Sequence, residues 1–400
     1  MIGREHAKPR HRLSNLAKFA CAIIVCGLIA VVIRGALTTA PRISSSDHQA
    51  ITVTDLAGFE LHLAKPAERI VLLRGRDLHE LAMLLGDKID DRLIAWGPDI
   101  LTADKDAYDA FVKRYPKLAK IPMIGSIYSD AIDVEQLLAL KPDLVVGDTF
   151  MVRRGYKSID RIREAGLPLI LTEMGTNPFE GPQKSLAVLA KALGKVEVAE
   201  GINAFLDEEI GKVFDRLPRT TQGPSIYIEC GNRGVNEFGH TFGYDGENRI
   251  ITWGAYMHRL HCENIALGVV PDMATLHPEQ ILKSDPDVII VTGSCWTNVP
   301  DSMRLGFQTS PEFARARLIA FTERPGWAQL QSVRTKRIYG LYHGFCFHPT
   351  AFAALQQIAK WIYPQRFRDL DPDENLRRFY DQFVPVELTG VWMSSLEVDD

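Results

Sequence analysis

Residues 134–146 read VEQLLALKPDLVV, and residues 278–290 read PEQILKSDPDVII. The two stretches are identical at five of thirteen positions and exchange one aliphatic residue for another at four more. Each predicts a short helix stopped by a proline, Pro142 or Pro286, and followed by a buried strand. Chance recurrence of such turns in an α/β protein is the simpler explanation, but the shared Glu-Gln pair favours two related lobes.

Apolar, strand-like runs alternate with helical stretches along the chain after residue 50. Several runs are continuous Val, Ile and Leu, which is typical of strands covered on both faces. The alternation predicts an α/β fold of two Rossmann-like lobes, each with a mainly parallel sheet flanked by helices. The expected strands are residues 69–73, 144–146, 169–171, 225–228, 288–291 and 337–339.

A strongly helical segment, Lys195 to Leu217, lies between the two repeats, and its apolar residues follow i, i+3, i+4 spacing. Its length of about 34 Å, at 1.5 Å per residue, would let one long helix bridge the lobes. We therefore expect an N-terminal lobe at residues 51–182, a bridging helix at 183–217 and a C-terminal lobe at 218–390.

The N-terminus has the layout of an export signal. A basic stretch precedes Phe19–Ile33, a run of fifteen uncharged, mostly apolar residues. This run is short for a membrane span of about 20 residues, and its basic flank is expected to stay cytoplasmic. Residues 1–40 are predicted to be either a cleaved signal peptide or an uncleaved membrane anchor, because Pro41 should hinder cleavage after Ala40.

The charge balance excludes one class of partner. The chain of 400 residues has 46 Lys and Arg against 50 Asp and Glu, a net charge of −4. Residues 1–34 hold six basic residues and one acidic residue, so the remainder holds 40 against 49, or −9. An acidic body gives no electrostatic case for binding nucleic acid.

Free thiols are favoured over disulfides at the four later cysteines, Cys230, Cys262, Cys295 and Cys346.

Several motifs, in order, resemble the periplasmic substrate-binding proteins of iron-siderophore and cobalamin ABC transporters. They are ITVTDLAG at residues 51–58, PAERIV at 66–71, the stretch from Glu135 to KPDLV at 141–145, ENIA at 263–266 and KWIYP at 360–364. The resemblance covers about residues 51–390. It implies two α/β lobes joined by one long helix, a ligand in the cleft between them, and delivery to an inner-membrane permease. It also implies one surface glutamate per lobe, Glu135 and Glu279, that pairs with arginines of the permease.

The loops after the strands should line the ligand site, because ligands of open α/β sheets bind beyond the carboxyl ends of the strands. Arginine suits the carboxylates or catecholates of a chelator, and aromatic rings suit its flat apolar parts. Arg74 and Arg76 stand where the resembled family has a Ser/Ala/Thr-rich loop. His343 is also a candidate direct metal ligand. The predicted ligand-binding residues are Arg74, Arg76, Phe150, Arg233, Trp296, Tyr342 and His343.

These observations favour a periplasmic, monomeric solute-binding protein that delivers a metal chelate, first of all a ferric siderophore, to an ABC permease. Haem, a corrinoid or a histidine-chelated divalent metal is the alternative ligand, and a membrane-tethered metal-chelate sensor is the alternative role. No resident cofactor and no catalytic residue is expected. The chain has no GxxxxGK[ST], HExxH or GxSxG motif and no GxGxxG after a strand, so an enzyme is not predicted.

Overall fold

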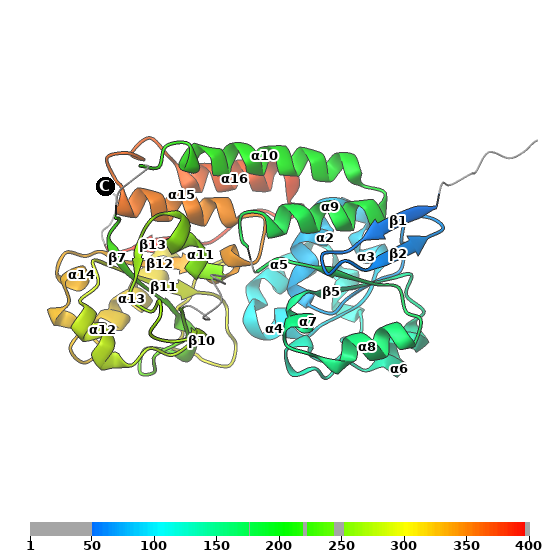
Figure 1. Ribbon diagram of the computed structural model, residues 1–400, viewed down its shortest axis with the longest axis horizontal. Coiled ribbons are helices and arrows are strands. Elements are labelled where there is room, and N and C mark those ends of the chain that lie inside the picture. Colours follow the sequence, from blue (N-terminus) through cyan, green and yellow to red (C-terminus); the bar gives the residue numbers. More distant parts are fainter. Residues whose placement is uncertain (1–49, 176, 219–221, 244–251, 397–400) are drawn as a thin grey trace, which may run out of the picture. The chain divides into compact units, whose positions relative to one another are not determined.

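Two separate β-sheets organise the chain in a computed structural model that describes residues 50–175, 177–218, 222–243 and 252–396. All described residues belong to one compact unit (Figure 1). The predicted signal or anchor at residues 1–40 lies outside these ranges. No helix in the described ranges combines the length and the apolar character that a membrane crossing needs.

The sheet of the N-terminal lobe is wholly parallel, with the strand order β4-β3-β5-β6. Ile70 and Leu72 of its strand β3 belong to one core cluster, and Val71 and Leu73 to another, so both faces are buried. This burial explains the continuous apolar run. The strands are β3 (Ile70–Leu72), β4 (Leu93–Trp96), β5 (Leu144–Asp148) and β6 (Leu169–Thr172), with a hairpin of β1 (Ile51–Thr54) and β2 (Glu60–Leu63). The helices are α2 (Leu78–Leu85), α3 (Ile89–Arg92), α4 (Asp99–Ala103), α5 (Lys105–Arg114), α6 (Val134–Leu140), α7 (Phe150–Arg153) and α8 (Lys157–Glu164).

The sheet of the C-terminal lobe has seven strands in the order β10-β8-β7-β11-β12-β13, with β9 beside β7. The central strands β7, β11 and β12 are parallel, and β8, β10 and β13 are antiparallel additions at the sides. The two-lobed α/β fold class is thus confirmed. The strands are β7 (Ser225–Cys230), β8 (Thr241–Phe242), β9 (Glu263–Asn264), β10 (Asp272–Ala274), β11 (Val288–Gly293), β12 (Ile338–Tyr342) and β13 (Met393–Ser395). The helices are α11 (Thr252–Arg259), α12 (Pro278–Ser284), α13 (Pro311–Thr322) and α14 (Gln331–Arg334).

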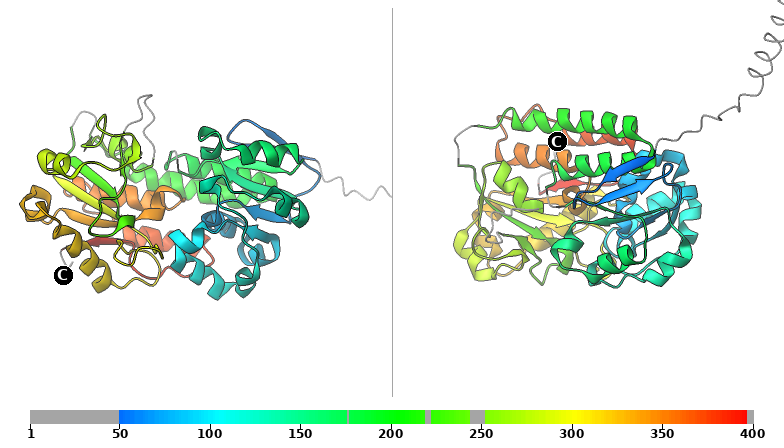
Figure 2. Two further views of the ribbon diagram at one scale, coloured as in Figure 1. Left: turned by 90° about the horizontal axis from the view of Figure 1, so that it is seen from below. Right: turned by 45° about the vertical axis from the view of Figure 1, so that its right-hand side comes forward.

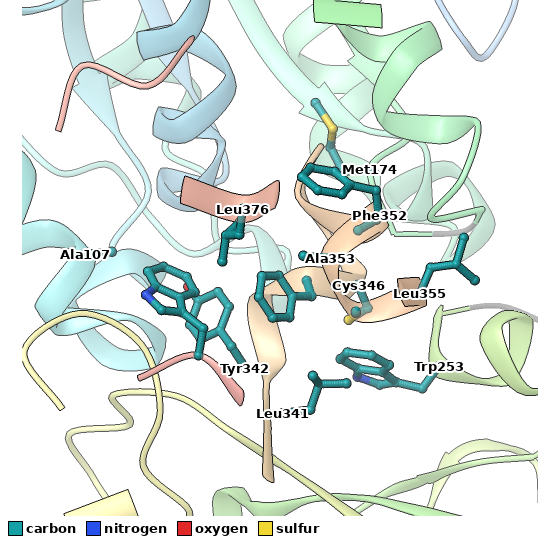
Figure 3. Packing of buried hydrophobic residues seen from close by; sticks show 14 of the residues in the cluster. Ala107, Met174, Trp253, Leu341, Tyr342, Cys346, Phe352, Ala353, Leu355 and Leu376 are labelled. Carbon is teal, nitrogen blue, oxygen red and sulfur yellow. The ribbon is translucent and has the colours of Figure 1, made fainter. Parts of the chain in front are cut away.

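The connection between the lobes is made of two helices. The range 183–217 contains most of α9 (Gly181–Leu193) and all of α10 (Val196–Phe214), and the chain turns between them at Gly194, whose φ is +66°. The 19-residue α10 runs along α15 (Ala351–Ile362) and α16 (Pro372–Phe383), which return from the C-terminal lobe (Figures 1 and 2). One apolar cluster continues through this layer and both lobes (Figure 3).

The repeated sequence forms equivalent turns in the two lobes. Helices α6 and α12 both end in a left-handed residue, Lys141 (φ +49°) and Asp285 (φ +41°), just before the proline. The next residue, aspartate in both copies, accepts a backbone N–H at the start of the neighbouring strand: Asp143 from Arg69 (2.6 Å) and Asp287 from Ser225 (2.8 Å). The Pro-Asp pair therefore fixes each helix-to-strand turn against the first central strand of its lobe.

Candidate functional site

A cavity of about 600 Å³ lies where strand ends from the two sheets meet. From the N-terminal lobe, Arg74 follows β3 and Asp148 ends β5; from the C-terminal lobe, Cys230 ends β7 and His343 follows β12. Among the residues that the structure describes, four arginines and two aspartates line the cavity, so their formal charges sum to +2 within an acidic body. Six aromatic residues also line it: Tyr128, Phe150, Tyr156, Phe242, Trp296 and Phe347.

Arg74 is committed to internal ion pairs. Its side chain is buried, with Nε 2.6 Å from Asp77 Oδ1 and Nη1 3.2 Å from Asp148 Oδ2. The two carboxylates outweigh the burial, and the pKa of Arg74 is raised well above its ordinary value. Arg74 thus organises the wall of the cavity, and little of its charge is free for a ligand.

Arg76 is held by a tightly packed loop. A Cβ on the preceding residue, Gly75, would lie 2.3 Å from the carbonyl oxygen of Gly97, so only glycine fits there. Asp99 accepts from the backbone N–H of Gly75 (2.6 Å) and from Arg76 Nε (3.1 Å). The other end of the guanidinium donates to the Tyr128 hydroxyl (2.6 Å). This packing explains the Arg-Gly-Arg sequence that departs from the resembled family.

Two further arginines, which the sequence reading missed, stand on α7 and just after it. Arg153 donates to the Thr149 hydroxyl (3.0 Å) and lies 3.6 Å from Glu173 Oε1. Arg154 is exposed and lines the cavity, and its side chain has no ion pair or hydrogen bond within the described part of the chain. Arg154 is therefore a cation that an anionic ligand can reach without displacing a carboxylate.

His343 lines the cavity from the C-terminal lobe. Its Nδ1 lies 2.9 Å from Thr292 Oγ1 and 3.8 Å from Cys230 Sγ, and its ring packs against Trp296 and Phe347. Burial, and after it the charge of Arg76, lower the pKa of His343 to about 3. The imidazole is thus neutral at physiological pH, and Nε2 is the nitrogen left for a ligand.

The remaining predicted ligand residues divide into two groups. Phe150 and Trp296 line the cavity. Tyr342 and Arg233 do not: Tyr342 is buried in the shared core (Figure 3), and Arg233 is exposed, with Nη2 2.9 Å from His240 Nε2. Arg233 therefore borders the site through His240, which does line it.

Buried polar side chains join the two lobes. Glu80 of α2 lies 2.7 Å from His348 Nδ1, the Tyr342 hydroxyl donates to Asp104, and the Ser294 hydroxyl donates to the carbonyl before Asp104 (2.7 Å). Burial raises the pKa of Glu80 to about 7 and holds the pKa of His348 well below its ordinary value. Together with the continuous core, these contacts restrict how far the lobes can separate.

The other residues singled out from the sequence lie away from the cavity. Glu135 and Glu279, the two predicted docking residues, are exposed in the first turns of α6 and α12. A separate surface pocket beside Arg259 is lined by His258 and His261. Across the residues that the structure describes, no three or more His, Cys, Asp or Glu side chains are grouped so as to hold a metal ion. The four cysteines are free, as expected, and all but Cys262 are buried.

Some of the cavity-lining residues that were not predicted lie next to predicted site residues in the sequence, and others do not. Phe347 belongs to the unusual YHGFCFHP loop at 342–349, and Arg153 and Arg154 follow Phe150 directly, so each stands beside a predicted site residue. Tyr128 and Tyr156 come from other loops and meet only in the fold, where the Tyr156 hydroxyl donates to the Tyr128 carbonyl (2.9 Å). No local pattern in the sequence marks these two tyrosines.

The fold and its inter-lobe cavity define a two-lobed solute-binding protein. The family model described as "Periplasmic binding protein" matches residues 85–343. The crystal structure of the TroA-like periplasmic binding protein FepB from Veillonella parvula is 32% identical, with a TM-score of 0.78, over 87% of this chain and 100% of that chain. This chain belongs to the periplasmic binding protein family, which confirms the resemblance and supports its assignment as a binding protein, not an enzyme.

Two curated relatives are more distant. The uncharacterized ABC transporter substrate-binding lipoprotein YvrC of Bacillus subtilis (strain 168) is 20% identical over 324 residues, 80% of this chain and 87% of YvrC. The molybdate-binding protein MolA of Haemophilus influenzae is 21% identical over 298 residues, 68% of this chain and 75% of MolA.

Proposed function

We propose that this chain is the substrate-binding component of an ABC importer and captures an anionic metal chelate, first of all a ferric siderophore. The observation that carries the proposal is the cavity itself. Its described lining combines a formal charge of +2, an arginine (Arg154) with no ion pair among the described residues, and six aromatic side chains. Carboxylates or catecholates of a chelator would meet the arginines, and its flat apolar parts would lie on the rings.

The size of the cavity supports a chelate over a small oxyanion. A volume of about 600 Å³ falls within the range of roughly 300–1,000 Å³ that is usual for organic ligands. A compact anion such as the molybdate in the name of MolA needs hydrogen-bond donors at close range and has no use for a wall of aromatic side chains.

Direct metal ligation is the second candidate, and His343 is the residue that favours it. Its imidazole is neutral and fixed at Nδ1 by Thr292, which is the state in which histidine binds metal through Nε2. Haem, a corrinoid or a divalent metal chelated by free histidine would each offer an open coordination position to it. In a membrane-tethered sensor, the same site would report such a ligand.

The two exposed glutamates support delivery to a permease. Glu135 and Glu279 occupy equivalent positions of the repeat, one per lobe, and would pair with basic residues of an inner-membrane permease. The chain would act as a periplasmic monomer, whether its N-terminus is removed or retained as an anchor. The buried links between the lobes favour ligand capture with a small lobe movement.

Tryptophan fluorescence tests the ligand assignment, because Trp296 lines the cavity. A ferric tris-catecholate or ferric hydroxamate siderophore should quench the fluorescence, whereas bare ferric or nickel ions should not. The quench should shrink in Trp296→Phe and persist in Trp361→Phe, since Trp361 instead stacks on Tyr339. Quenching by bare metal that disappears in His343→Ala would replace the chelate assignment with direct ligation.

Uptake by cells tests the delivery step separately. The double variant Glu135→Arg with Glu279→Arg should abolish ligand uptake and leave ligand affinity unchanged, because both carboxylates lie away from the cavity. Loss of ligand binding in this variant would contradict the docking role.

A further inference from the structure

The two repeat helices share an exposed leucine as well as an exposed glutamate. Leu138 on α6 is 45% exposed and Leu282 on α12 is 38% exposed. They occupy the same position of the repeat, 144 residues apart. The preceding apolar residue in each helix, Leu137 or Ile281, is fully buried. Each helix therefore keeps one apolar residue in the core and turns another toward solvent.

The leucine and the glutamate lie on one face of each helix. Leu138 comes three residues after Glu135, and Leu282 three residues after Glu279, and residues at this spacing are neighbours on a helix surface. Neither carboxylate has an ion pair within the described part of the chain. Each lobe thus presents an unpaired negative charge beside an uncovered apolar side chain.

The fold holds Leu282 in place. Gly326, at φ +85°, lies under the side chain, and a Cβ there would come within 2.9 Å of Leu282 Cδ1. The leucine is therefore supported on one side and exposed on the other. In the view of Figure 1, α6 and α12 both lie on the side of the molecule away from α10.

A single exposed leucine needs no explanation in a soluble protein. Two at equivalent positions, each beside an unpaired glutamate, are harder to attribute to chance. Protein interfaces commonly place apolar anchors inside a polar rim, and a carboxylate at the rim selects a basic partner. The partner that fits is a surface with two apolar pockets, each bordered by a lysine or an arginine.

We propose that Leu138 and Leu282 are the apolar anchors of the surface that docks on the permease. The inference rests on the proposed function, because the permease is the partner expected at Glu135 and Glu279. The glutamates supply long-range attraction and orientation, and the leucines supply the buried contact that keeps the complex together.

The test measures binding of the protein to its cognate permease–ATPase complex, reconstituted in lipid nanodiscs, at two salt concentrations. Leu138→Ser with Leu282→Ser should weaken docking by about tenfold or more, equally at low and high salt. Glu135→Arg with Glu279→Arg should weaken it most at low salt. The matched control is Leu267→Ser, a 44% exposed leucine outside both repeats, which should dock like the wild type.

The outcomes distinguish a failure of the leucine anchors from a failure of the proposed function. If the leucine variant docks like the wild type while the glutamate variant does not, the leucine anchors are wrong and the proposed function stands. An equal loss in Leu267→Ser would also overturn the anchors. If the wild-type protein does not bind the complex at all, the proposed function fails. Unchanged urea unfolding of the leucine variant, and recovery of docking in Leu138→Met with Leu282→Met, exclude misfolding as the cause.

Discussion

Replacing Glu80 by Gln should change how the stability of the protein depends on pH. Glu80 is fully buried in α2 and contacts His348 of the other lobe at 2.7 Å. Burial raises the pKa of its carboxyl from 4.5 to about 7, although the charges of His79 and Arg74 act in the opposite direction. A glutamine of the same shape can accept a hydrogen bond from His348 Nδ1–H without ever carrying a charge.

The direction in which stability changes with pH follows from whether the folded or the unfolded protein holds the proton. Between pH 4.5 and 7 the folded protein keeps a proton on Glu80 that the unfolded chain releases. The free energy of unfolding therefore falls as pH rises through this window, and the full penalty is present above pH 7. At 1.36 kcal/mol per pKa unit, the wild type should lose about 2 to 3 kcal/mol relative to Glu80→Gln between pH 5 and pH 8.

Other buried groups titrate nearby, which is why the difference between the two proteins is the quantity to measure. Burial also raises the pKa of Asp77 to about 7, giving a slope of the same sign. Burial lowers the pKa of His343 and His348, so acid should destabilise the fold through them, with the opposite sign. The contribution of His343 remains in both proteins and cancels in the difference. The charge of Glu80 itself raises the pKa of Asp77, so removing it also reduces the penalty from Asp77 and adds to the difference with the same sign. His348 contacts Glu80 directly, so its contribution is part of the measured difference.

Urea unfolding followed by circular dichroism at pH 5, 6, 7 and 8, at constant ionic strength, measures this difference. Glu80→Gln should gain stability relative to the wild type at each step up in pH. The exposed Glu60→Gln is the matched control and should run parallel to the wild type. A constant offset for Glu80→Gln, or a relative loss of stability with rising pH, would refute the assignment of a buried, protonated carboxyl.

Two further predictions concern the repeat and the cavity. Asp143→Ala and Asp287→Ala should each destabilise the protein by about 1–3 kcal/mol, measured by urea unfolding. Each substitution removes a charged acceptor from backbone N–H groups at the start of a strand. If either variant lost no stability, the two turns would not be equivalent. Arg154→Ala should weaken binding of a ferric tris-catecholate siderophore about tenfold at low salt and less at high salt, measured by fluorescence titration. The control is Arg161→Ala, which changes an exposed arginine on α8 and should bind the siderophore like the wild type. An affinity unchanged in Arg154→Ala would show that the ligand does not use this charge.

The strands and the repeat were predictable because their signals are local. A run such as Val288–Val291 is buried on both faces, and its composition reports that burial directly. The turns at Pro142 and Pro286 were predictable for the same reason, since proline restricts its own and the preceding residue whatever the rest of the chain does. The turn between α9 and α10 also has a local signal, which is Gly194 itself. The helical spacing after Lys195, however, does not reveal that a separate helix, α9, ends just before this turn.

The candidate site was only partly predictable, because its charges depend on partners far apart in sequence. Arg74 and Arg154 look alike in the sequence, yet Arg74 pairs with Asp77 and Asp148, while Arg154 lines the cavity with no ion pair to any residue that the structure describes. The strand-end rule leads to the cavity but cannot rank its arginines, because the pairing of Arg74 with Asp148 exists only once β3 and β5 lie side by side.

The same reasoning explains why Tyr342 fell outside the cavity. It ends β12, where the strand-end rule places ligand residues, but its hydroxyl reaches Asp104 in the other lobe and its ring packs on Phe345 and Trp392. A residue at a strand end can therefore serve the ligand or the contact between lobes. In a two-lobed protein with a shared core, both uses compete for the same positions. Here His343, the next residue, lines the cavity, and Tyr342 makes the contact between the lobes.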